Sequence, residues 1–78
     1  MPNAAARARR QELLEAMRAE PRHWTTGQVT DLYVANGWGC NRSAARADLR
    51  ALAADGHLIE HGPENERSYR LNAAQDTR

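Results

Sequence analysis

The sequence predicts a small α+β domain in which three helices are followed by a two-stranded β-hairpin. Three observations predict this fold class. The chain has 78 residues, which is enough for one domain only. Apolar residues recur at helical spacing as far as Gly56, and beyond it they alternate with a period of two. We therefore expect one domain over residues 1–78, with its core at about 10–72 and loose ends.

The first helix is expected over Ala4–Ala19. This alanine-rich segment consists of good helix formers, and Pro21 follows it and disfavours a further turn. Leu13, Leu14 and Met17 fall on one stripe of the helix and predict its buried side.

A capping signal opens the second helix. Thr25 and Gln28 have the spacing of a capping box, in which each side chain satisfies a backbone amide of the other residue. Gly37 is suited to end the helix in a left-handed conformation. Apolar residues recur between these signals at Val29, Leu32 and Tyr33.

The third helix is expected to start at Asn41, a favourable N-cap, and to run to Asp55 before Gly56. Its predicted buried stripe consists of Ala45, Leu49 and Leu52. A row of arginines follows one flank at positions i, i+4 and i+8, namely Arg42, Arg46 and Arg50. Small residues lie on the face opposite the core, at Ser43 and Ala47.

The period-two segment predicts the hairpin. Leu58–His61 is the first strand, 62–66 the turn and Arg67–Leu71 the returning strand. Tyr69 and Leu71 share one face of the second strand. An isolated hairpin is barely stable, so we expect it to pack against the helices.

Composition excludes several classes of protein. The chain is 41% hydrophobic and 27% charged, which is too apolar for a disordered tail. No apolar run approaches the roughly 18 residues that a membrane span needs, and no signal peptide pattern is present. The expected location is therefore cytoplasmic.

The sequence contains no motif that predicts an enzyme or a metal site. The sequence has no glycine-rich phosphate loop and no nucleophile with a plausible base, so we expect no enzyme. Cys40 is the single cysteine, so an internal disulfide is excluded. We expect Cys40 to be a buried thiol. His57 and His61 lie about 13 Å apart on a strand, too far to share a metal ion. We expect no cofactor and no small-molecule ligand.

The distribution of charge matters more than its total. All eleven basic residues are arginine, yet ten acidic residues reduce the formal net charge to +1. Arginine presents a planar fork that suits phosphate groups and guanine edges. A basic surface for nucleic acid must therefore come from the placement of the arginines.

Two segments resemble a known family. The run 40–59 combines a polar cap, arginines, Asp48-Leu49 and a later Gly56-x-Leu58, and it resembles the recognition helix and first wing strand of bacterial winged helix-turn-helix regulators of the DeoR and GntR types. Arg67–Leu71 is similar to the closing wing strand. The resemblance covers about residues 10–72. It implies that the third helix enters the DNA major groove while the wing contacts a flanking phosphate strand or the minor groove.

The resemblance also implies the contact residues. Groove contacts are expected along the N-terminal part and outer face of the third helix, at Asn41, Arg42, Ser43, Arg46, Ala47 and Arg50. Phosphate contacts are expected at the start of the second helix and in the wing, at Thr25, Thr26, Gln28, Arg67 and Arg70.

The expected function is sequence-specific binding of double-stranded DNA by a small transcriptional regulator. A homodimer is expected, with Leu14 and Met17 on the first helix as its surface. Two alternatives remain open: a protein–protein adaptor on the same fold, favoured by acidic residues at Glu64 and Glu66, and an excisionase-like architectural factor that bends DNA.

Two features also have plainer interpretations. The arginine row of the third helix would be an ordinary solvated face if it paired with Asp48 or Asp55. The N-terminal arginines are expected at a solvated helix end, with a minor-groove arm as the alternative; they are Arg7, Arg9 and Arg10.

Overall fold

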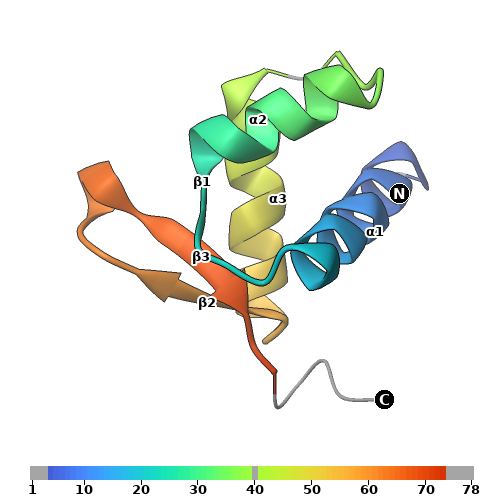
Figure 1. The fold of residues 1–78 in the computed structure, drawn as a ribbon. Coiled ribbons are helices and arrows are strands. Elements are labelled where there is room, and N and C mark those ends of the chain that lie inside the picture. The colour runs from blue at the N-terminus through green and yellow to red at the C-terminus, as the bar shows by residue number, and fades with distance from the viewer. Residues whose placement is uncertain (1–3, 40, 74–78) are drawn as a thin grey trace.

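The computed structural model describes residues 4–39 and 41–73, which form an α+β fold of three helices and one antiparallel sheet (Figure 1). The helices are α1 (Ala4–Ala19), α2 (Thr26–Ala35) and α3 (Arg42–Ala54). The strands are β1 (Trp24–Thr25), β2 (Leu58–His61) and β3 (Ser68–Leu71), with a 3-10 turn, η1 (Glu64–Glu66), at the hairpin tip. The expectations for Cys40 and for both chain ends lie outside the described residues.

The predicted helices and their caps are confirmed. The Thr25 hydroxyl accepts from the Gln28 amide at 3.2 Å, and the Gln28 side-chain oxygen accepts from the Thr25 amide at 2.9 Å, which completes the capping box. Asn41 caps α3 by accepting from the amide of Ala44 at 3.0 Å. Gly37 follows α2 with φ of +81°, the left-handed conformation that glycine adopts without strain.

The sheet has one strand more than the expected hairpin. β3 is central, with β2 on one side and β1 on the other, so the expected β2–β3 hairpin is present and β1 is an additional strand that the sequence did not predict. Trp24 lies opposite Tyr69, and Leu58 lies opposite Leu71. A strand of two residues has no detectable period, and its partner is remote in the sequence. β1 therefore forms only once the tertiary structure brings these segments together.

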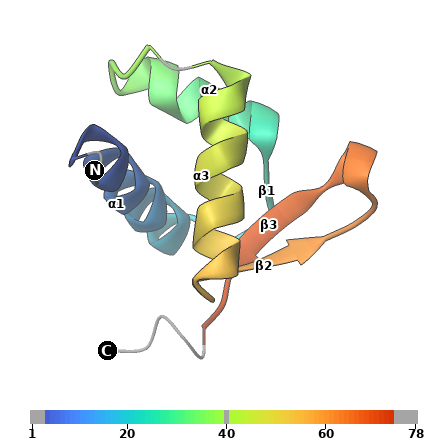
Figure 2. The same ribbon diagram turned by 180° about the vertical axis from the view of Figure 1, so that it is seen from behind.

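The core lies between the helices and the inner face of the sheet. Seen from behind, α3 stands between α1 and the sheet (Figure 2). The largest fully buried apolar side chains come from all three helices and include Leu13, Val29, Tyr33 and Leu49. Trp24 covers the core from β1, and Trp38 packs against its edge. None of the described helices is long and apolar enough to cross a membrane.

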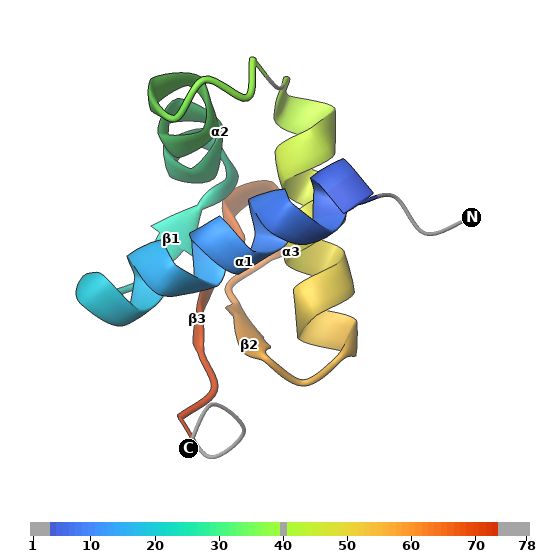
Figure 3. The same ribbon diagram turned by 90° about the vertical axis from the view of Figure 1, so that its right-hand side faces the viewer.

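Leu14 and Met17, the residues of α1 expected at a dimer surface, are buried within the chain. Leu14 and Met17 are 7% and 1% exposed, because α1 turns this stripe inward where it crosses α3 (Figure 3). Both side chains belong to the core of the single chain. The assignment of these two residues to a dimer contact is therefore wrong.

Candidate nucleic-acid interface

Helix α3 divides into a buried face and an exposed face. Its buried residues are Ala45, Asp48, Leu49 and Leu52. Its exposed residues include every predicted groove-contact position on the helix, namely Arg42, Ser43, Arg46, Ala47 and Arg50. The helix thus keeps its arginine row and its small residues on the solvent side.

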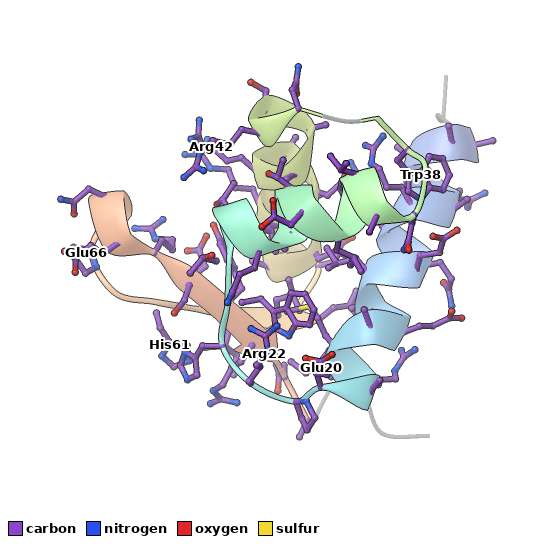
Figure 4. The ribbon with its side chains drawn as sticks, turned by 45° about the horizontal axis from the view of Figure 1, so that its top comes forward. Glu20, Arg22, Trp38, Arg42, His61 and Glu66 are labelled. Atoms are coloured by element: carbon purple, nitrogen blue, oxygen red, sulfur yellow. The ribbon has the colours of Figure 1, made fainter. Side chains whose placement is uncertain are left out.

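A groove of about 440 Å³ separates α3 from the hairpin. Its lining brings together Thr25, Thr26, Arg42, Arg46, Arg50, Asn65, Glu66, Arg67 and Tyr69. Figure 4 shows Arg42 projecting from the start of α3, with Glu66 across from it at the hairpin tip. Four of the lining residues are arginines and one is acidic, so the groove is strongly cationic although the whole chain is nearly neutral.

The three arginines of α3 are unpaired. Among residues 4–39 and 41–73, no side chain or carbonyl group forms a hydrogen bond or an ion pair with Arg42, Arg46 or Arg50. The Nη1 atom of Arg42 lies 3.5 Å from the point that a Cβ atom on Gly27 would occupy. The guanidinium group therefore lies over the first turn of α2, where the helix dipole is also positive. Two positive groups that meet in this way favour an anion between them.

Arg67 closes the groove from the hairpin side. Its Nη1 atom lies 3.6 Å from the Glu60 carboxylate, and its Nε atom is buried without a hydrogen-bond partner in the described part of the chain. Burial and the negative charge of Glu60 raise the pKa of the neighbouring Tyr69 hydroxyl, which therefore stays neutral at physiological pH. Arg67 is partly exposed and lines the groove, and its ion pair with Glu60 is long.

Three predicted contact residues lie elsewhere or have local partners. The Gln28 side-chain oxygen is used in the capping box, and the Asn41 side-chain oxygen caps α3. Arg70 lies outside the groove, because neighbouring residues of a strand point to opposite faces and Tyr69 occupies the groove side. The Nε atom of Arg70 donates to His61 at 3.0 Å, and its Nη1 atom donates to the Leu71 carbonyl at 3.1 Å.

Asp48 is the buried anchor that sequence reasoning did not identify. Its side chain is 0% exposed, yet its oxygens accept four hydrogen bonds. Arg9 donates from Nε at 2.6 Å and from Nη2 at 3.0 Å, Arg10 donates from Nε at 2.8 Å, and the Tyr33 hydroxyl donates at 2.7 Å. The cluster joins all three helices and holds α3 in place from behind.

The Asp48 cluster corrects two interpretations of the charge pattern. Asp48 pairs with arginines of α1, so it does not neutralise the arginine row of α3. Arg9 and Arg10 are held against the domain and cannot form a mobile arm. A signal was present in the sequence, because Asp48 lies three residues after Ala45 and four before Leu52 on the buried stripe.

This cluster predicts a loss of stability in acid. Burial opposes ionisation of Asp48, but the hydrogen bonds from Arg9, Tyr33 and Arg10 outweigh it and lower the pKa of the carboxyl group. Stabilisation is therefore complete above the unfolded-state pKa of about 3.9 and is lost as the pH falls through the folded-state value. We expect Arg10→Gln to be less stable than the parent chain near neutral pH, and the difference to shrink in acid. Urea unfolding at several pH values measures it, and a difference that does not change with pH would contradict the assignment.

The described histidines form no metal centre. No group of three or more histidine, cysteine or acidic side chains lies close enough to hold an ion within residues 4–39 and 41–73. The His61 ring instead contacts the His23 ring in a tilted arrangement, with the ring centroids 4.5 Å apart.

Comparison with protein-family models, with curated proteins and with solved structures finds no match for this chain.

Proposed function

We propose that this chain binds double-stranded DNA in a sequence-specific manner, as a small transcriptional regulator of the winged helix-turn-helix class. One observation carries the proposal. Three exposed arginines of α3 have no partner in the described part of the chain, and a fourth, Arg67, faces them across an open groove.

The dimensions of DNA suit this surface. The major groove of B-DNA is about 12 Å wide and admits one α-helix. Ser43 and Ala47 on the exposed face of α3 have short side chains, which let the helix backbone come close to the base edges. In this arrangement Arg46 and Arg50 reach bases, and each bidentate contact with guanine contributes about 1–3 kcal/mol of discrimination.

A phosphate strand fits the groove between α3 and the hairpin. Arg42 and the first turn of α2 supply positive charge at one end, and Thr25 and Thr26 line the same end. Arg67 supplies charge from the hairpin. Phosphate contacts of this kind fix the position of the protein without reading sequence. Glu66 at the tip repels phosphate, so we place the DNA strand on the α3 side of the groove.

The salt dependence of duplex binding tests the proposal. If Arg42 and Arg67 each neutralise one phosphate, the logarithm of the association constant falls with the logarithm of salt concentration with a slope of about −2. Fluorescence anisotropy with a labelled random-sequence duplex measures the slope. We expect Arg67→Gln to make it less steep by about one unit. Arg70→Gln removes one arginine from β3 outside the groove, so it is the matched control and is expected to leave the slope unchanged.

The adaptor alternative predicts a different result. A protein–protein adaptor shows no measurable affinity for any duplex, even at low salt, and that outcome would overturn the proposal. Equal effects of Arg67→Gln and Arg70→Gln would show that general charge, and not the groove, governs binding. A bend in the bound duplex would favour the architectural alternative over a transcriptional regulator.

A further inference from the structure

A second cationic pocket lies on the other side of the sheet. It has a volume of about 630 Å³ and is lined by Arg18, Pro21, Arg22, His23, Arg70, Leu71 and Ala73. Figure 4 shows Arg22 and His61 near the sheet and far from Arg42. We propose that this pocket binds a small organic anion in which a carboxylate is attached to an apolar body. This site is separate from the DNA groove and does not depend on it.

The positive charge of the pocket favours an anionic ligand. Among the described residues, three arginines and a histidine contribute to its lining, and no acidic residue does. The acidic partner of Arg22 is Glu20, whose carboxylate lies 3.3 Å from Nε of Arg22. Both side chains of that pair are exposed, so solvent weakens it. The positive charge of Arg22 and Arg70 is therefore neutralised only weakly within the described residues.

Two of the arginines are held in place before any ligand binds. Arg70 donates to His61 and to the Leu71 carbonyl, which leaves its Nη2 atom without a partner among the described residues. Arg22 lies over the Trp24 ring at 4.1 Å and donates to the carbonyl of His23. Arginines fixed in this way lose less conformational freedom when they bind a carboxylate, which favours affinity.

His61 supports the position of Arg70. It accepts the hydrogen bond from Arg70, which requires an unprotonated Nε2 atom. Partial burial, followed by the charges of His23 and Arg70, lowers the pKa of His61 and keeps the ring neutral near physiological pH. The hydrogen bond that orients Arg70 is therefore present under those conditions.

The shape of the pocket distinguishes a compact ligand from a second DNA segment. Pro21, Leu71 and Ala73 give it an apolar part, which an aryl or alkyl group covers and a phosphate strand does not. Its volume falls within the roughly 300–1,000 Å³ of small-molecule sites. DNA strands instead require a row of basic groups along their length.

Titration with a panel of carboxylates tests the inference. The probes are phenylacetate, benzoate and hexanoate, with phenylacetamide as the uncharged control, and isothermal calorimetry with Trp24 fluorescence reports binding. We expect at least one carboxylate to bind at millimolar concentration or below, and the amide to bind about tenfold more weakly or worse. Arg70→Gln and Arg22→Gln are each expected to weaken the carboxylate about tenfold. Arg46→Gln, in the DNA groove, is the matched control and should leave it unchanged.

Several outcomes would overturn the inference. The first is that no carboxylate binds at millimolar concentration. The second is that phenylacetamide binds as tightly as the carboxylates. The third is that the Arg70→Gln variant, shown by circular dichroism to be folded, binds the carboxylate as tightly as the parent chain. Binding of an oligoglutamate peptide in place of the small carboxylates would also overturn it and assign the pocket to an acidic protein partner. Because Arg22 and Arg70 lie outside the groove, each of these results is independent of duplex binding.

Discussion

Asp48→Ala is expected to destabilise the domain by about 3–5 kcal/mol, the usual effect of removing one partner from a buried ion pair. The carboxylate accepts hydrogen bonds from α1 and α2, so its loss leaves the Tyr33 hydroxyl and the arginine donors without their acceptor. Small domains of this size have a total stability of the same order. Most Asp48→Ala molecules should therefore be unfolded at room temperature, which circular dichroism and urea titration measure.

Asp31→Ala is the matched control for this variant. Asp31 lies on the exposed side of α2, so the substitution removes the same charge from a helix surface. We expect a change within about 0.5 kcal/mol, as at most exposed positions. Equal effects of the two substitutions would show that the buried cluster does not hold the helices together. Tyr33→Phe should be intermediate, at about 1 kcal/mol, because it removes one of the four hydrogen bonds.

Simultaneous replacement of the α3 arginine row by glutamine is expected to abolish duplex binding near physiological salt. A hydrogen bond to a charged group contributes about 1.5 kcal/mol at the low end, so three arginines together account for an affinity change on the order of 1,000-fold. None of the three arginines contacts another described side chain through a hydrogen bond or an ion pair. Urea unfolding should therefore be nearly unchanged, which separates a loss of binding from a loss of folding. The variant combines Arg42→Gln, Arg46→Gln and Arg50→Gln.

Single substitutions then separate base reading from phosphate binding. We expect Arg46→Ala and Arg50→Ala to reduce discrimination between sites selected from a random duplex pool. Arg67→Ala should weaken binding to all duplexes alike and make the salt dependence less steep. If Arg46 and Arg50 are replaceable without any effect on any duplex, the assignment of α3 as the reading helix is wrong.

Local signals explain which parts of the fold were predictable. The capping box at Thr25, the Asn41 cap and the left-handed Gly37 act within one or two helical turns, so the sequence alone locates the ends of α2 and α3. The apolar stripe of α3 likewise fixes which side of that helix is buried. Its exposed arginines follow from the same period, and five predicted contact residues of α3 lie on its exposed face.

Remote contacts explain what was missed. Sequence period placed Leu14 and Met17 on a stripe but did not show which element would cover it, and the stripe faces the domain core, not a second copy. Strand β1 has two residues and depends on β3 for its hydrogen bonds. Arg67 and Arg70 look equivalent in the sequence, yet Arg67 precedes β3 and lines the groove, whereas Arg70 lies within β3 and lines the second pocket.

Hydrogen bonds and packing between near neighbours encode the helices, the hairpin and the exposed arginine row of α3, so these features are predictable from the sequence. Contacts between distant segments are needed to hold Asp48 against Arg9, to place Arg67 across a groove from the arginine row, and to form the second cationic pocket behind the sheet. These features depend on the angles at which the helices and the sheet pack. Such angles follow from the fit of many side chains that are distant in the chain, which no local pattern records.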